Sequence, residues 1–279
     1  MTRAIRWRLL ATVFAAALFV GCDDSGDINL FSEADDAKLG EDVAAEIEAD
    51  PANYPPYDGD PAVATYVEGV FQNVLASPEV ERKEAFDYEI TLIGDAETLN
   101  AFALPGGKIY VYEGLLKYLD SEAALAGVIA HEVAHCEKRH ATQRMTAYYG
   151  VSALLSLLLG NSPSMLTEIA ANLFVNVAFL ANSRADEDQA DEYSYIYMND
   201  TKYYPGGVKF FFEKMRDDGL VDEGGQGIAT FLSTHPDPID RIATTNERLR
   251  ENGVTVVEHD ATGNNLYKSD YKTNVLDKL

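Results

Sequence analysis

The chain has 279 residues, 47% of them hydrophobic and 10% aromatic, which is enough apolar material for one large domain or two small ones. Its 46 acidic and 22 basic side chains give a formal net charge of -24, which argues against nucleic-acid binding because phosphate contacts need a basic surface. A mean hydropathy of -0.17 disfavours a multi-pass membrane protein, and 2 cysteines exclude a disulfide-stapled scaffold.

The N-terminus has the pattern of a bacterial lipoprotein signal. Three arginines precede an uncharged, mainly apolar run over residues 9–20, which is shorter than the roughly 20 residues that a transmembrane helix needs. We therefore expect a cleaved signal peptide over residues 1–21. The sequence FVGC at residues 19–22 resembles the lipobox, with phenylalanine in place of the usual leucine. Cys22 is expected to carry a lipid that anchors the protein to a membrane, with ordinary secretion as the alternative.

Residues 22–36 are acidic and poor in apolar side chains, so they predict a flexible, lipidated tether ahead of the folded domain. A stretch with four prolines, residues 50–61, ends the first helix of that domain. The apolar residues of this helix recur at helical spacing: Leu39, Val43 and Ile47.

The next patterns predict a helix and a small sheet. A second amphipathic helix carries the apolar stripe Val63, Val67, Val70, Phe71, Val74 and Leu75. Apolar and polar side chains alternate over residues 86–92, which predicts a half-buried strand. Residues 100–104 and 108–112 flank a Pro-Gly-Gly sequence, whose turn chemistry predicts a β-hairpin.

A further helix is expected to run from Asp120 or Ser121, either of which can cap it, to about Met145. The segment that follows, residues 148–181, holds a single charged residue, Glu168. A Gly-Asn-Ser-Pro sequence divides it, and each half is short for a membrane span. Two buried core helices are the favoured interpretation, with a mobile lid or a membrane-dipping hairpin as alternatives.

The C-terminal part is predicted to be helical. Helices are expected over residues 187–199 and 205–217, and an Asp-Pro pair at 237–238 is expected to cap a last amphipathic helix. Residues 253–279 are expected to form a strap. Because no internal repeat or low-complexity linker divides the chain, we expect one mostly helical α+β domain with a small sheet over residues 37–252.

The sequence HEVAH at residues 131–135 is an HExxH motif inside a predicted helix. Positions i and i+4 lie about 40° apart around a helix, so the imidazoles of His131 and His135 face one point where Zn²⁺ can bind. Glu132 is the next residue around the helix and can reach a water molecule at the metal. The motif therefore predicts a catalytic site with one zinc ion per chain and Glu132 as the general base.

Two histidines leave a catalytic zinc one protein ligand short. Glu187 is the best candidate, because Glu187 and Asp191 are spaced i, i+4 and share a face of a predicted helix. Asp191 is then expected to accept the outer N–H of a ligand histidine and so fix its tautomer. Without the HExxH motif, this acidic block would be interpreted as an exposed helix surface.

His140 lies about 180° around a continuous helix from His131 and is expected at the surface.

Four blocks of the sequence together resemble the gluzincin peptidase family that contains HtpX, the CAAX prenyl endopeptidases, mitochondrial Oma and periplasmic BepA. In the order of the family they are residues 100–107 (NAFALPGG), 131–135 (HEVAH), 183–191 (SRADEDQAD) and 235–242 (HPDPIDRI). The resemblance implies a zincin-like, mostly helical catalytic domain, zinc dependence and endopeptidase activity. The sequence shows neither the membrane spans of the first two groups nor the helical repeats of BepA-like proteins, so it is expected to be similar to the small periplasmic lipoprotein members.

Further roles are expected outside the HExxH motif. By this resemblance, His235 is expected either to donate to the oxyanion of the transition state or to occupy the fourth zinc position at rest. Arg184 and Arg241 are expected to brace the acidic residues of the site. The hairpin strand is expected to offer its edge to an extended substrate, with ordinary sheet pairing as the alternative. The residues of that edge are Ala101, Phe102 and Ala103.

The leading interpretation is a zinc endopeptidase anchored by lipid to a bacterial envelope membrane and facing the periplasm, where it cleaves misfolded or mislocalised envelope proteins. Its expected partners are unfolded protein substrates and the membrane, and no nucleic acid. The alternative is a non-proteolytic chaperone or assembly factor on the same fold. Glu132 argues against this alternative, because a purely structural zinc site needs a fourth ligand and no base.

Overall fold

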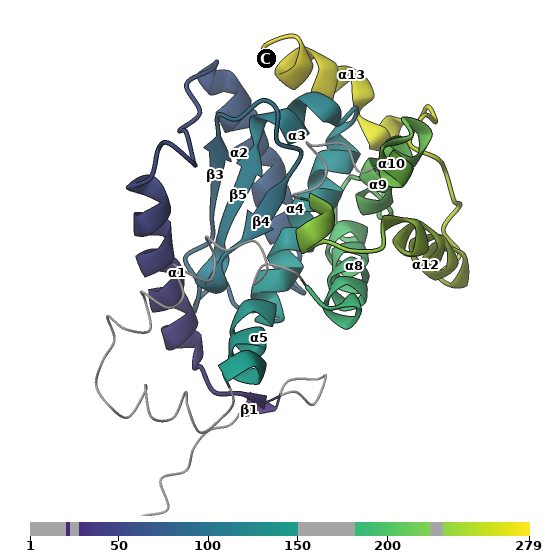
Figure 1. The fold of residues 1–279 in the computed structure, drawn as a ribbon. Coiled ribbons are helices and arrows are strands. Elements are labelled where there is room, and N and C mark those ends of the chain that lie inside the picture. The colour runs from purple at the N-terminus through teal and green to yellow at the C-terminus, as the bar shows by residue number, and fades with distance from the viewer. Residues whose placement is uncertain (1–20, 23–27, 150–181, 224–230) are drawn as a thin grey trace, which may run out of the picture.

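Helices form most of the protein, and a small three-stranded sheet lies beside them (Figure 1). The computed structural model describes residues 21–22, 28–149, 182–223 and 231–279. The predicted mostly helical α+β class is confirmed. The predicted signal peptide and the charge-poor segment over residues 148–181 lie almost entirely outside the described residues. Within the described ranges, no helix has the length and apolar character that a transmembrane span needs.

The first helix begins earlier than the composition predicts. Strand β1 (Gly21–Cys22) pairs antiparallel with β2 (Ile28–Asn29). Helix α1 (Glu33–Glu48) then starts at a capping box, in which Ser32 and Asp35 each accept a hydrogen bond from the backbone N–H of the other residue. The local capping signal thus sets the helix start inside the segment that was expected to be a tether.

The same segment is packed against the body of the domain. Asn29 is buried, and its Nδ2 donates to Oγ1 of Thr142 2.9 Å away. Asp36 is also buried, and its Oδ2 lies 2.5 Å from Nε of Arg139. The prediction of a flexible tether over residues 22–36 is therefore wrong for its second half. Polar side chains there bind partners more than one hundred positions away, which composition cannot reveal.

Helix α2 (Pro61–Leu75) follows the predicted apolar stripe. Asp60 caps it through a side-chain oxygen that accepts from the backbone N–H of Ala62, and a proline occupies the first turn. All six residues of the stripe are buried, and α2 packs on α4 (Glu122–Glu137). The predicted amphipathic helix is confirmed.

The sheet has the strand order β3-β5-β4, with β5 (Lys108–Tyr112) in the centre. Strand β4 (Ala101–Ala103) pairs antiparallel with β5, so the predicted hairpin is confirmed. Its turn is η1 (Pro105–Gly107), in which Gly106 has φ 74° and Gly107 has φ 95°. Glycine is needed at both positions, because residues with a Cβ rarely adopt these angles.

Strand β3 (Glu89–Ile93) overlaps the strand predicted over residues 86–92 and pairs with β5 in parallel. Helix α3 (Glu113–Tyr118) follows β5 directly. Helix α1 packs against η1 and β5, and α4 packs against β4, β5 and η1. The hairpin is therefore held between the first helix and the helix that carries the HExxH motif.

Helix α4 lies at the centre of the domain, and all 16 of its residues are buried. Ser121 caps its N-terminus by accepting from a backbone N–H of the first turn. The prediction of one helix running to about Met145 is wrong, because α4 ends at Glu137 and Arg139 has φ 60°. Helix α5 (His140–Tyr149) then begins. Left-handed φ is uncommon for residues other than glycine. An arginine at this position therefore gives no signal in the sequence that the helix breaks here.

The three helices expected in the C-terminal part are present; two of them have shifted starts, and the last begins at Pro238 as expected. Helices α8 (Arg184–Asn199) and α9 (Val208–Asp217) pack on α4, and α12 (Pro238–Glu251) packs on α8 and α9. The short helix α10 (Leu220–Glu223) follows α9. In Figure 1, α8, α9 and α12 form the green side of the molecule, away from α1.

The segment expected to form a strap packs into the core. It contains η3 (Asn264–Leu266), α13 (Lys268–Tyr271) and η4 (Lys272–Leu276). Tyr271 is fully buried, and its hydroxyl donates to the backbone carbonyl of Leu116, 2.7 Å away. The C-terminal segment therefore contributes to the same core as the site helix α4.

Helices α4 and α9 approach each other closely at Gly127, where a Cβ atom would lie 2.1 Å from the backbone nitrogen of Val208. Gly127→Ala is expected to lower the free energy of unfolding by about 1–3 kcal/mol, because a backbone atom cannot move aside as a side chain can. The matched control is Gly69→Ala on α2, where nothing lies within 4 Å; it should stabilise the fold by up to about 1 kcal/mol. Urea unfolding measures the free energy of unfolding of both variants. Equal unfolding midpoints for Gly127→Ala and Gly69→Ala would contradict the close packing of α4 and α9.

Candidate metal centre

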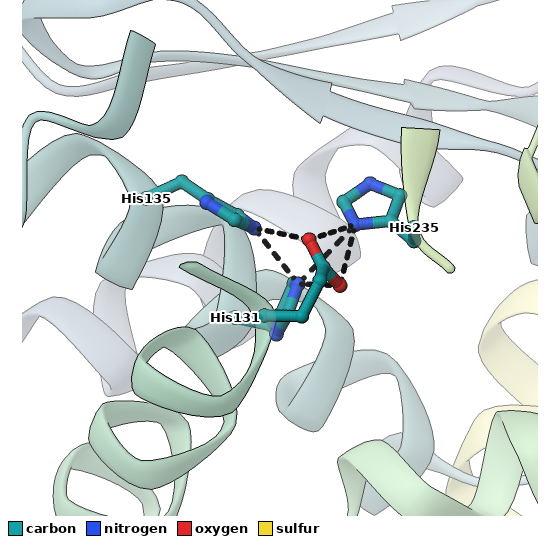
Figure 2. A group of neighbouring side chains, drawn as sticks. His131, His135 and His235 are labelled. Atoms are coloured by element: carbon teal, nitrogen blue, oxygen red, sulfur yellow. Dashed lines mark hydrogen bonds and ion pairs between the residues drawn. The ribbon is translucent and has the colours of Figure 1, made fainter. Parts of the chain in front are cut away.

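His131 and His135 lie on one face of α4 and turn their rings toward each other. Both side chains are buried, their Nε2 atoms are 2.9 Å apart and their ring centroids are 4.6 Å apart. Figure 2 shows these two rings and that of His235 directed at one point. The i, i+4 spacing of the HExxH motif produces this convergence of the two α4 rings.

Glu187 reaches the same point from α8. One of its carboxylate oxygens lies 3.4 Å from Nε2 of His131, and the other lies 3.3 Å from Nε2 of His135. His235 precedes α12, and its Nδ1 lies 3.1 Å from both carboxylate oxygens. The ligand atoms of these four residues all lie within 4.8 Å of one another. Packing of α4, α8 and the start of α12 thus brings together residues that are up to 104 positions apart.

The chemistry of these four groups fits a metal ion. Imidazole nitrogens and a carboxylate oxygen are the ligands that Zn²⁺ takes in hydrolytic sites. Nδ1 of His131 lies 2.9 Å from Asp191, and a carboxylate there holds the ring proton on Nδ1 and leaves the lone pair of Nε2 facing the cluster. Such inward lone pairs suit a bound cation, so the residues fit zinc.

Arg241 extends from α12 to both carboxylates of α8. Its Nε and Nη2 lie 2.7 and 2.6 Å from the two oxygens of Asp191, and its Nη1 lies 2.5 Å from Glu187. The guanidinium also covers the ring of Phe212, 4.2 Å from the ring centroid. This bidentate placement is what a bracing role for Arg241 requires.

Arg184 does not join the cluster. Its side chain is 80% exposed, and its Nε lies 2.5 Å from Asp237. The expectation that Arg184 braces the acidic residues of the site is therefore wrong, because Arg241 already occupies the place beside both carboxylates. Asp237 in turn makes no side-chain capping bond to α12, although it precedes the first residue of that helix as expected.

His140, expected at the surface, is instead buried beside the cluster. It is 1% exposed, and its Nδ1 lies 2.7 Å from Nδ1 of His135. The expectation assumed a continuous helix, and the left-handed Arg139 breaks that helix.

Asn182, which precedes α8, also lies at the site, with its Nδ2 3.3 Å from Nε2 of His135. No motif singled out Asn182, since it lies outside the helical pattern.

Comparison with known proteins agrees with this geometry. The model of the family described as peptidase family M48 matches residues 61–249, which is more than half of the chain. The chain belongs to peptidase family M48. The matched range contains the HExxH motif, Glu187, Asp191, His235 and Arg241, and it also contains His140 and Asn182.

Three relatives place this M48 domain among named proteases. The mitochondrial metalloendopeptidase OMA1 of Schizosaccharomyces pombe is 33% identical over 186 residues, 67% of this chain and 53% of that protein. The protein of the same name from Arabidopsis thaliana is 34% identical over 155 residues, 55% of this chain and 30% of that protein. The β-barrel assembly-enhancing protease of Escherichia coli K12 is 27% identical over 214 residues, 73% of this chain and 42% of that protein. The chain therefore spans about half or less of the length of these relatives.

Burial and neighbouring charges shift the pKa values at the M48 site in opposite directions. Burial alone would raise the pKa of Glu187, but the charges of His235, Arg241 and His131 hold it well below its usual value. Burial and the charge of Arg241 lower the pKa of His131, yet Glu187 and Asp191 outweigh them and raise it to about 9. Glu187 is therefore charged and available as a ligand at neutral pH, whereas a proton and a metal ion compete for His131.

A cavity of about 30 Å³ lies beside the M48 site, with room for about one water molecule. The residues that line it include Glu132 and His235, together with Phe102 and Ala103 from strand β4. Ala101, at the other end of the strand, is not among the described residues that line it. Burial raises the pKa of Glu132, and the charge of His235 opposes the rise.

Glu187→Ala is expected to remove more metal than Asp191→Ala. The first change deletes a ligand, whereas the second deletes only the outer partner of His131, a loss typically worth about 10–100-fold in affinity. Mass spectrometry of the purified variants measures their zinc content. Asp188→Ala, which removes a 62% exposed carboxylate of the same helix, is the matched control. Equal zinc in wild type and Glu187→Ala would show that a different carboxylate is the ligand.

Proposed function

We propose that the chain is a zinc-dependent endopeptidase in which His131, His135 and Glu187 hold the metal. The observation that carries the proposal is the convergence of these side chains beside a cavity that Glu132 lines. Membership of peptidase family M48 and relatives that are named metalloendopeptidases support it.

Each residue has a task in the cleavage of a peptide bond. When bound, zinc would supply Lewis acidity, which polarises the scissile carbonyl and acidifies a water molecule. The carboxylate of Glu132 would take a proton from water and later deliver it to the leaving amine. Burial raises the pKa of Glu132, which makes it a better proton acceptor than an exposed carboxylate. Arg241 keeps Glu187 ionised and oriented.

His235 occupies the place where a fourth ligand would lie. Its Nδ1 is 3.1 Å from Glu187 and 3.4 Å from Nε2 of His131. Its ring stacks on Phe231 with the centroids 4.9 Å apart, and its Nε2 lies 3.6 Å from Glu132. Of the two roles expected from the sequence, this position supports the fourth ligand at rest rather than the oxyanion donor.

The proposed substrate is an extended protein segment. Strand β4 is an edge of the sheet, and its outer side pairs with no strand of the described chain. Phe102 and Ala103 of this edge line the cavity beside Glu132. An unfolded chain that adds to the edge through backbone hydrogen bonds would lie across the site, so cleavage would depend on unfolded backbone more than on sequence.

The proposed location is the periplasmic side of a bacterial envelope membrane, with misfolded or mislocalised envelope proteins as substrates. The lipobox-like sequence that ends at Cys22 supports a lipid anchor. Bacterial relatives are named for the assembly of β-barrels, an architecture of outer membranes, which supports an envelope role. Membrane fractionation of wild type and Cys22→Ala tests the anchor.

His235→Ala is expected to raise the basal cleavage of a soluble substrate, because it opens the fourth position to water and substrate. If His235 instead donates to the oxyanion, the same change should lower kcat by about 10²–10³. Steady-state kinetics on a fluorogenic peptide distinguish the two outcomes. His259→Ala, which alters a histidine paired with Asp217 outside the site, is the control. A rate equal to wild type would contradict both roles.

Casein digestion with and without a chelator, followed by zinc addition, tests the proposed activity.

Glu132→Gln is expected to keep the fold and the zinc but lose about 10²–10⁴-fold in rate, because it removes the base without removing a ligand. Glu192→Gln, an exposed position on α8, should cleave like wild type. Nearly full, chelator-sensitive cleavage by Glu132→Gln would contradict the mechanism. A wild-type chain that binds zinc and prevents aggregation without any cleavage would instead support the chaperone alternative.

A further inference from the structure

We propose that His140 is a positioning residue of the metal site, which accepts a hydrogen bond from Nδ1–H of His135 and so directs the Nε2 lone pair of His135 at the metal. The inference rests on the proposed metal site. It assigns a task to a buried histidine that lies outside the HExxH motif and outside the four residues whose ligand atoms converge.

A chain of three contacts sets the direction of these hydrogen bonds. Nε2 of His140 lies 2.8 Å from Oε1 of Gln189, and Nδ1 of His140 lies 2.7 Å from Nδ1 of His135. An amide oxygen can only accept, so Nε2 of His140 carries the proton. In a neutral imidazole the other nitrogen then accepts, which makes Nδ1 of His135 the donor. His135 is thereby left with an unprotonated Nε2, 3.3 Å from Glu187.

The two α4 histidines are thus oriented by different chemistry. Nδ1 of His131 faces the carboxylate of Asp191 at 2.9 Å, and Asp191 is paired with Arg241. Nδ1 of His135 faces the neutral ring of His140, with the ring centroids 4.9 Å apart and the planes at 73°. A ring nitrogen fixes the tautomer as a carboxylate does, but it brings no negative charge into a site that already contains Glu187.

The break between α4 and α5 is what allows this contact. Arg139 has φ 60°, and this left-handed residue turns the chain so that His140 lies against His135. In a continuous helix the two side chains would point about 140° apart. Arg139 is held in place by Asp36, 2.5 Å from its Nε, and by the backbone carbonyl of Phe31. A non-glycine residue with positive φ persists where surrounding contacts hold it.

Helix α8 supplies the other end of the chain of contacts. Gln189 lies two residues after Glu187, so the same helix that contributes a ligand also orients the ring behind another ligand. His140 is 1% exposed, which keeps water from replacing either of its two partners. The contact therefore joins α5 to α4 and α8, the two helices that carry His131, His135 and Glu187.

The test measures zinc affinity of the purified full chain by competition with a chromophoric chelator, and the absorption spectrum of the cobalt-substituted chain. His140→Phe keeps the ring shape but offers no acceptor, and it is expected to weaken affinity about 10–100-fold and to shift the cobalt spectrum. His140→Asn places Oδ1 near the position of Nδ1 and should restore most of the affinity. His259→Phe is the matched control and should bind zinc like wild type.

The outcomes separate this inference from the proposed function. Wild-type affinity in His140→Phe would overturn the inference alone, and so would an Asn variant as weak as the Phe variant, because the effect would then be one of packing. A wild-type chain that binds no metal would overturn the proposed function as well. Should His140→Phe fail to fold, Gln189→Leu frees the far end of the contact chain without altering His140. It is expected to weaken zinc binding in the same direction, and unchanged affinity would overturn the inference.

Discussion

The contact of one guanidinium with two buried carboxylates is the interaction on which the rest of the site depends. Glu187 and Asp191 would be costly to remove from water without opposite charge and hydrogen bonds. Arg241 donates two hydrogen bonds to the oxygens of Asp191, and its charge pairs with both Asp191 and Glu187. Each carboxylate also contacts His131. Because α12 supplies the cation, α8 the anions and α4 the imidazole, the site exists only when these three helices are packed together.

The corner between α4 and α5 connects the site to the beginning of the folded chain. Arg139 pairs there with Asp36 and with the carbonyl of Phe31, and Thr142 accepts from Asn29. Residues 29–36 are thereby packed against the helix corner that carries His140. The start of α1 is thus connected to the helix corner beside the metal site, although composition alone predicts a tether over these residues.

The sequence by itself determined the features that follow from local spacing. The i, i+4 histidines of the HExxH motif face one point on any helix, and the i, i+4 pair Glu187 and Asp191 shares a face for the same reason. Apolar periodicity predicted α2, alternation predicted β3, and the Gly-Gly turn predicted the β4–β5 hairpin. The family resemblance, confirmed by the match over residues 61–249, rests on the same short blocks.

Only the tertiary structure decided which distant side chains meet. The parallel pairing of β3 with β5, the choice of Arg241 over Arg184 beside the carboxylates, and the burial of His140 each depend on contacts between separate elements. The last of these depends on a single left-handed residue, Arg139, whose conformation is held by partners about one hundred positions earlier. Periodicity describes one helix at a time, and packing energy between helices selects the backbone break and the pairs that no local pattern contains.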